Sequence, residues 1–123
     1  MIFTTTRVRF PSGSDVLVGD LHQPQGQDAA SATTIVIVTG SWTTVKEQQA
    51  DFYARRLAAA GLTTLVFDFR GFGQSEGNPR CWENPARKVE DIRAAVSFAA
   101  SQGYTRIGAL GICASAGYQA MNA

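Results

Sequence analysis

The 123-residue sequence lacks several features that whole classes of protein require. It contains one histidine, His22, and two cysteines, Cys81 and Cys113, whose spacing matches neither a disulfide framework nor a zinc site. No apolar run approaches the roughly 20 residues of a membrane-spanning helix, and the amino-terminal residues do not resemble a signal peptide. We therefore expect no bound metal and no membrane contact. We also expect a cytoplasmic protein, because free thiols persist in a reducing compartment.

Charge of either sign is sparse and evenly spread. The 11 Lys and Arg residues nearly balance the 10 Asp and Glu residues, which leaves a formal net charge of +1. The basic residues are scattered and form no stripe, so we expect no nucleic-acid partner. Hydrophobic residues make up 45% of the chain, which is ordinary for a globular core. The length allows one domain, residues 1–123.

The apolar pattern predicts an α/β fold that begins with an antiparallel hairpin and continues as a mostly parallel sheet. The expected strands are residues 3–10, 15–22, 33–39, 62–69 and 107–112, and the expected helices are 44–60, 85–102 and a third that begins beyond 112. Thr44 and Glu47 fit a capping box for the first helix, and Asn84-Pro85 fits the start of the second. Strands that alternate with helices in this way indicate a parallel sheet covered on both faces.

The strongest chemical signal lies at residues 110–117, LGICASAG, where a strand runs directly into a helix. A nucleophile at such a turn needs small neighbours two residues away on either side, because the strand and the helix would otherwise collide. Cys113 satisfies this spacing with Gly111 and Ser115, and Ser115 satisfies it with Cys113 and Gly117. We favour Cys113, because the strand ends more naturally just before it. Two alternatives stay open. Ser115 can be the nucleophile instead, or Cys113 can be a small buried core residue without a chemical role.

A loop after the first parallel strand is the second signal. Parallel strands deliver their following loops to one edge of the sheet, so this loop can direct a backbone N–H group toward the turn at Cys113. We expect an oxyanion hole formed by Ser41 or Trp42 together with Ala114, the residue after the nucleophile. A plain strand-to-helix connection capped by Thr44 is the alternative.

Residues 67–77, FDFRGFGQSEG, bear a partial likeness to a dinucleotide-binding fingerprint. That fingerprint must open directly into a helix, whereas Asn78 and Pro79 continue this segment as a loop. We therefore interpret Asp68 and Arg70 as structural residues that brace the loop, and we expect no cofactor.

Three motifs, DFRGFGQSEGNPR, NPARKVEDIRAAVSFA and LGICASAGY, resemble the α/β-hydrolase superfamily and cover most of the chain. The likeness is strongest to its dienelactone-hydrolase-like and Xaa-Pro-dipeptidyl-peptidase-like branch. Dienelactone hydrolases use cysteine at this turn, which the resemblance carries onto Cys113, whereas many relatives use serine. The family often has His-Gly in the oxyanion loop, and this sequence has Thr39-Gly40 instead.

The resemblance implies a hydrolase of esters, lactones, thioesters or related acyl compounds, with a small-molecule acyl substrate. In this family the acid and the histidine follow the nucleophile along the chain, so both are expected beyond Ala123. His22 precedes the core, and we interpret it as a structural residue of a strand. The 123 residues alone are therefore expected to be inactive, with the last strand open to a missing carboxyl-terminal half or to a second copy. A truncated hydrolase domain that binds without turnover is the alternative function.

Overall fold

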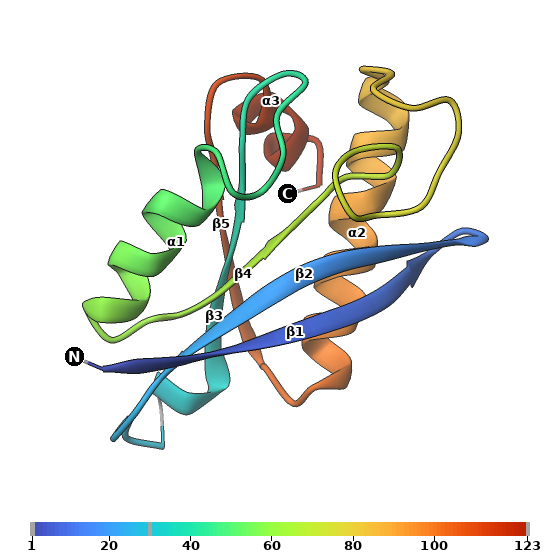
Figure 1. The fold of residues 1–123 in the computed structure, drawn as a ribbon. Coiled ribbons are helices and arrows are strands. Elements are labelled where there is room, and N and C mark those ends of the chain that lie inside the picture. Colours follow the sequence, from blue (N-terminus) through green and yellow to red (C-terminus); the bar gives the residue numbers. More distant parts are fainter. Residues whose placement is uncertain (1, 30, 123) are drawn as a thin grey trace.

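Five strands form one mixed sheet in the computed structural model, which describes residues 2–29 and 31–122 (Figure 1). Their order across the sheet is β1-β2-β4-β3-β5. The strands are β1 (Phe3–Ser12), β2 (Asp15–Pro24), β3 (Thr34–Thr39), β4 (Thr63–Phe67) and β5 (Arg106–Gly111). The helices are α1 (Ala50–Ala59), α2 (Pro85–Ser101) and α3 (Ala114–Ala120), with a 3₁₀ turn at Ser31–Thr33. None of the helices in the described residues is long and apolar enough to cross a membrane.

The predicted mixture of antiparallel and parallel pairing is confirmed. β1 and β2 form an antiparallel hairpin, and β2 also lies antiparallel to β4. β3 pairs in parallel with β4 on one side and with β5 on the other, so the loops after these three strands emerge at the same edge.

The parallel strands are apolar on both faces, because each face of the sheet is covered by helices. On β3, Ile35 and Ile37 join the core beneath α2, whereas Val36 and Val38 face α1. This alternation follows from the two-residue period of a strand. It explains why residues 33–39 are a continuous hydrophobic and β-branched run.

The helix after the long loop begins as predicted. The Asn84 side chain accepts hydrogen bonds from the backbone N–H groups of Ala86 and Arg87, at 3.0 and 3.3 Å, and Pro85 occupies the first helical position. These bonds satisfy two of the N–H groups that a helix start leaves without partners.

The predicted capping box at Thr44 is wrong. α1 begins only at Ala50, and its cap residue, Gln49, makes no side-chain capping bond. The Thr44 hydroxyl instead donates to the Ser41 carbonyl at 2.8 Å. The physical reason is Lys46, whose backbone N–H and ammonium group both bind the Asp68 carboxylate, at 2.8 Å each. These bonds hold the loop against the end of β4, and the helix starts after it.

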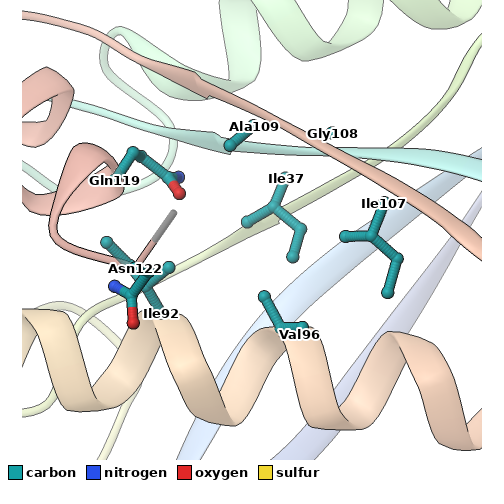
Figure 2. A pocket seen from close by; sticks show the side chains of 8 residues that line it. All are labelled: Ile37, Ile92, Val96, Ile107, Gly108, Ala109, Gln119 and Asn122. Atoms are coloured by element: carbon teal, nitrogen blue, oxygen red, sulfur yellow. The ribbon is translucent and has the colours of Figure 1, made fainter.

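One edge of β5 is open within the described part of the chain, as predicted. β5 pairs only with β3, and Gly108 and Ala109 in its middle are exposed. An apolar pocket of about 240 Å³ lies between β5, α2 and α3 (Figure 2). Its lining consists of Ile37, Ile92, Val96, Ile107, Gly108, Ala109, Gln119 and Asn122.

Candidate active site

The turn after β5 has the strained backbone that the sequence predicts. Cys113 stands directly before α3 with φ 58° and ψ −120°, in a region that non-glycine residues rarely adopt. A Cβ added at Gly111 would lie 2.5 Å from the Ser115 carbonyl oxygen, so only glycine fits there. The Cys113 residue is exposed at the tip of this turn.

Ser115 occupies a different environment. It is the second residue of α3, is fully buried, and donates a hydrogen bond from its hydroxyl to the Gly40 carbonyl. The two residues that share the sequence motif are thus separated by the fold. Cys113 faces outward at the turn, whereas Ser115 joins the helix to the loop after β3.

The loop after β3 lies against this turn, as the parallel arrangement predicts. Thr39 is in register with Gly111, and its carbonyl accepts a hydrogen bond from the Ile112 N–H at 3.0 Å. The Thr39 hydroxyl also accepts a bond from the Gln119 side chain on α3, at 3.1 Å. Residues 39–40 and the segment 111–119 are therefore bonded to each other at the carboxyl edge of the sheet.

The candidate oxyanion donors differ in availability. The Ser41 N–H donates to the Gln49 side chain at 3.3 Å and is already occupied. The backbone N–H groups of Trp42 and Ala114 donate no hydrogen bond to any residue that the structure describes. Trp42 is also 65% exposed, so its loop borders solvent beside the turn.

Glu83 ties together three segments around the turn, a role that the motifs do not indicate. Its carboxylate accepts hydrogen bonds from the Thr43 N–H at 3.0 Å, the Lys88 ammonium at 2.8 Å and the Tyr118 hydroxyl at 2.7 Å. Burial raises the pKa of Glu83, but the bonds from Lys88, Thr43 and Tyr118 outweigh it, and the net pKa lies below the ordinary value. Burial and the contact with the Glu83 carboxylate raise the pKa of Tyr118.

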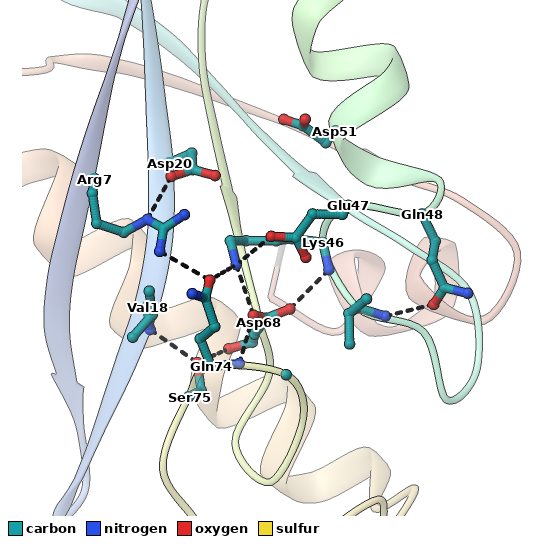
Figure 3. A network of polar contacts seen from close by, with 12 residues as sticks. Arg7, Val18, Asp20, Lys46, Glu47, Gln48, Asp51, Asp68, Gln74 and Ser75 are labelled. Atoms are coloured by element: carbon teal, nitrogen blue, oxygen red, sulfur yellow. Dashed lines mark hydrogen bonds and ion pairs between the residues drawn. The ribbon is translucent and has the colours of Figure 1, made fainter.

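A second ionic cluster holds the loop after β3 from its other end (Figure 3). The side chains of Lys46 and Asp68 are fully buried, and Gln74 binds both of them. Burial lowers the pKa of Lys46, but hydrogen bonds from its ammonium group to Asp68 and Glu47 outweigh this effect and raise the pKa.

The structural interpretation of Asp68 and Arg70 is confirmed. Besides its bonds to Lys46, Asp68 accepts a hydrogen bond from the Gln74 N–H at 3.0 Å. Arg70 donates from its side chain and its backbone to the fully buried Asp91, at distances between 2.7 and 3.1 Å. Both residues fasten the loop between β4 and α2 to the sheet and the helix. A nucleotide site requires a helix directly after Gly77, whereas α2 begins only at Pro85.

His22 is distant from Cys113 and already has two partners. It is fully buried, and its ring nitrogens contact the Thr5 hydroxyl at 2.8 Å and the Asp51 carboxylate at 2.7 Å. Successive strand pairs place His22 in register with Gly108 of β5, which lies three strands away across the sheet. Gly108 precedes Cys113 by five residues along the chain. Strand spacings of ~4.8 Å and residue rises of ~3.3 Å separate the two positions by roughly 20 Å. The structural interpretation of His22 is confirmed.

Within the described residues, no group of three His, Cys, Asp or Glu side chains converges to hold a metal ion. The apolar pocket beside β5 contains none of the predicted site residues. The carboxyl edge carries an exposed thiol on a strained turn, and the loop after β3 is bonded to that turn through the carbonyls of Thr39 and Gly40.

Comparison with known proteins identifies relatives of this arrangement. YcjY of Escherichia coli K12 is 48% identical over 79 residues, which cover 62% of this chain and 26% of that protein. PA2218 of Pseudomonas aeruginosa is 38% identical over 110 residues, which cover 87% of this chain and 29% of that protein. The chain therefore spans less than a third of the length of these relatives.

Solved structures agree with the fold. The crystal structure of PA2218 superposes with a TM-score of 0.83 at 34% identity, covering 94% of this chain and 37% of that one. The α/β-hydrolase GrgF from Penicillium shares the fold, with a TM-score of 0.81 at 22% identity, covering 94% of this chain and 39% of that one.

The family described as serine aminopeptidase, S33 matches residues 29–117, a span that runs from the loop before β3 into α3 and includes the turn at Cys113. The chain belongs to this family and, with it, to the α/β-hydrolase superfamily.

Proposed function

We propose that this chain carries the nucleophile and the oxyanion-binding groups of a hydrolase that cleaves esters, lactones, thioesters or related acyl compounds. The observation that carries the proposal is the backbone of Cys113, an exposed thiol with φ 58° between a required glycine and a helix. Strained backbone of this kind persists where the surrounding structure enforces it, and it is typical of a nucleophile elbow. Ser115 is the less favoured nucleophile, because its hydroxyl is buried and bonded to Gly40.

The chemistry follows from this geometry in two steps. The Cys113 thiolate attacks the acyl carbonyl carbon, a C–S bond forms, and the carbonyl electron pair moves to oxygen. The N–H groups of Trp42 and Ala114 donate to that oxyanion, since the Ser41 N–H is occupied by Gln49. Collapse expels an alkoxide or thiolate, which takes up the proton that the Cys113 thiol lost and leaves as the alcohol or thiol. Water then cleaves the thioester, releases the acid and restores the thiol.

The general base and its acid partner are proposed to come from residues outside these 123. The only histidine here, His22, is buried and held by Asp51 and Thr5. Without a general base the nucleophile is not activated, so the 123 residues alone are expected to show no turnover.

Both cysteines are exposed free thiols, which supports a reducing cytoplasm as the location. Fractionation of cells that express a tagged full-length gene product tests this. Recovery from an oxidising compartment would contradict it.

The deciding experiment compares Cys113→Ala, Cys113→Ser and Ser115→Ala in the full-length gene product. A p-nitrophenyl ester and an acyl thioester serve as substrates, and intact-mass spectrometry detects the acyl-enzyme. We expect Cys113→Ala to lose turnover by a factor on the order of a million, as removal of a nucleophile does. Ser115→Ala should still form an acyl adduct at Cys113. Its folded state should be less stable than that of the wild type, because the hydrogen bond from Ser115 to Gly40 is lost.

Two outcomes would contradict the proposal. Turnover that survives Cys113→Ala and disappears in Ser115→Ala would assign the nucleophile to Ser115. Wild-type protein that binds acyl compounds without cleaving them would indicate the non-catalytic binding module.

A further inference from the structure

Glu83 accepts hydrogen bonds from the loop after β3, from α2 and from α3, the helix that Cys113 directly precedes, and nothing in the proposed chemistry uses this carboxylate. One oxygen binds the Thr43 N–H in the loop after β3 and the Lys88 ammonium on α2, and the other binds the Tyr118 hydroxyl on α3. We propose that Glu83 is a positioning residue, which sets the distance between the two oxyanion donors by holding Thr43 and Tyr118 on one carboxylate. This inference rests on the proposed function.

The loop after β3 needs such an anchor because its backbone is strained. Thr43 has φ 51°, a conformation that a β-branched residue adopts only when its surroundings enforce it. The Thr44 hydroxyl holds the Ser41 carbonyl at 2.8 Å, and that carbonyl shares a peptide plane with the Trp42 N–H. The bond from Thr43 to Glu83 fixes the next peptide. Together they determine where the Trp42 N–H points.

The second donor is held from the helix side. Tyr118 follows Ala114 by one turn of α3, so the two residues lie on the same face of that helix. The Tyr118 hydroxyl is 2.7 Å from Glu83, and the residue is only 8% exposed. A fixed Tyr118 therefore fixes the orientation of the helix start, where the Ala114 N–H and Cys113 lie.

Lys88 keeps the carboxylate in place. It is 2% exposed, and its ammonium lies 4.5 Å and 4.6 Å from the ring centroids of Phe69 and Phe72 while it binds Glu83 at 2.8 Å. A buried cation without a partner is unfavourable, so Lys88 strongly prefers an ionised Glu83 beside it. Burial raises the pKa of Glu83, but the three donors lower it more, which keeps the carboxylate charged.

The test uses the full-length gene product with Glu83→Gln, Lys88→Met and the double variant Glu83→Gln/Lys88→Met. The double variant removes the buried cation that Glu83→Gln alone would leave unpaired, and the alkylation rate reports whether the turn keeps its structure. Glu76→Gln is the matched control, because Glu76 lies in the same loop and binds a backbone N–H, that of Val16, away from the turn. Two rates are measured on each protein, acylation by a p-nitrophenyl ester and alkylation of Cys113 by iodoacetamide.

The two rates respond differently to a displaced oxyanion hole. Alkylation displaces iodide directly and forms no oxyanion, whereas acylation depends on both donors. Loss of one oxyanion donor lowers kcat by about 100- to 1,000-fold, and displacement of a donor should cost on the order of 10- to 100-fold. We expect Glu83→Gln and the double variant to lose acylation by that factor with KM nearly unchanged, and to keep the alkylation rate. The control should match the wild type in both rates.

Two results would overturn the proposal. If the double variant is acylated at the wild-type rate, Glu83 has no positioning role, and the proposed function is unaffected. If acylation and alkylation fall equally, the substitution has disrupted the site as a whole, which also contradicts a specific role of Glu83 in placing the oxyanion donors. If the wild-type protein is alkylated at Cys113 but never acylated, the proposed function fails first, and the positioning role fails with it.

Discussion

Replacing Asp68 with alanine should destabilise this fold more than any exposed charge substitution. The Asp68 carboxylate and the Lys46 side chain are both fully buried and lie 2.8 Å apart. The carboxylate also accepts bonds from the backbone N–H groups of Lys46 at 2.8 Å and Gln74 at 3.0 Å. Asp68→Ala thus removes the acceptor of two backbone N–H groups and one of the partners of the buried Lys46 ammonium (Figure 3).

The expected loss in the free energy of unfolding is about 3 kcal/mol. Removal of one partner from a buried ion pair costs about 3–5 kcal/mol. Lys46 keeps two other partners, Glu47 at 2.8 Å and Gln74 at 2.6 Å, so the lower end of this range applies. Such a loss is large beside the total stability of about 5–15 kcal/mol that is usual for a domain.

Urea denaturation of the full-length gene product, followed by circular dichroism, measures this loss. Lys46→Met and the double variant complete a thermodynamic cycle, whose coupling energy should be about 1–3 kcal/mol because the two residues are in contact. Arg55→Ala is the control, because Arg55 is 51% exposed in its pair with Asp51 and should cost only about 0.3–0.5 kcal/mol. If Asp68→Ala costs no more than Arg55→Ala, or if the cycle is additive, the buried pair does not hold the loop as argued.

Three further predictions follow from other contacts. Gly111→Ala should lower the free energy of unfolding by about 1–3 kcal/mol and abolish acylation, because the new Cβ would lie 2.5 Å from the Ser115 carbonyl oxygen. Unchanged urea stability and acylation would show that glycine is not required at this position. Asn84→Ala should cost about 1 kcal/mol in urea through loss of the two α2 capping bonds, whereas a cost near zero would mean that the cap is dispensable. The pKa of Glu83 is lower in the folded state than its ordinary value of 4.5, so ionised Glu83 stabilises the fold at pH values above 4.5. This stabilisation is lost as the pH falls through the folded-state pKa. Urea stability of Glu83→Gln/Lys88→Met should therefore fall less steeply below pH 4.5 than that of the wild type, and identical slopes would contradict this.

The fold could be predicted from the sequence wherever local pattern and tertiary packing agree. The run at 33–39 becomes β3 because both of its faces are covered, and Asn84-Pro85 starts α2 because its cap needs only the two following N–H groups. Thr44 and Glu47 are the contrary case. Their local capping pattern is overridden by Asp68, which follows β4 and is remote in sequence. Asp68 binds Lys46, a residue that lies between Thr44 and Glu47. A contact of that kind leaves no local pattern.

The candidate site divides along the same line. The turn at Cys113 is encoded by adjacent small residues, so its strained backbone is predictable. The spacing also fits Ser115, and the end of the strand favours Cys113 only modestly. The fold separates the two clearly, because it buries Ser115 against Gly40, a residue of another loop. The oxyanion loop could likewise be placed at the correct edge, whereas the occupation of the Ser41 N–H by Gln49 depends on the late start of α1.

The Glu83 cluster had a sequence signal that the hydrolase motifs obscured. Lys88 stands one turn before Ile92 and continues the buried stripe of α2 that includes Ala95 and Ala99. A lysine in such a stripe is rarely fully buried without a charged partner, so its position predicts a nearby carboxylate. Periodicity cannot say which carboxylate, because Glu83 lies in the preceding loop and Tyr118 on another helix. The identity of the partner depends on how the loop between β4 and α2 folds back, and that depends in turn on the Asp68 and Arg70 contacts that fasten the loop. The same contacts that fasten this loop therefore decide which groups bind Thr43, Lys88 and Tyr118.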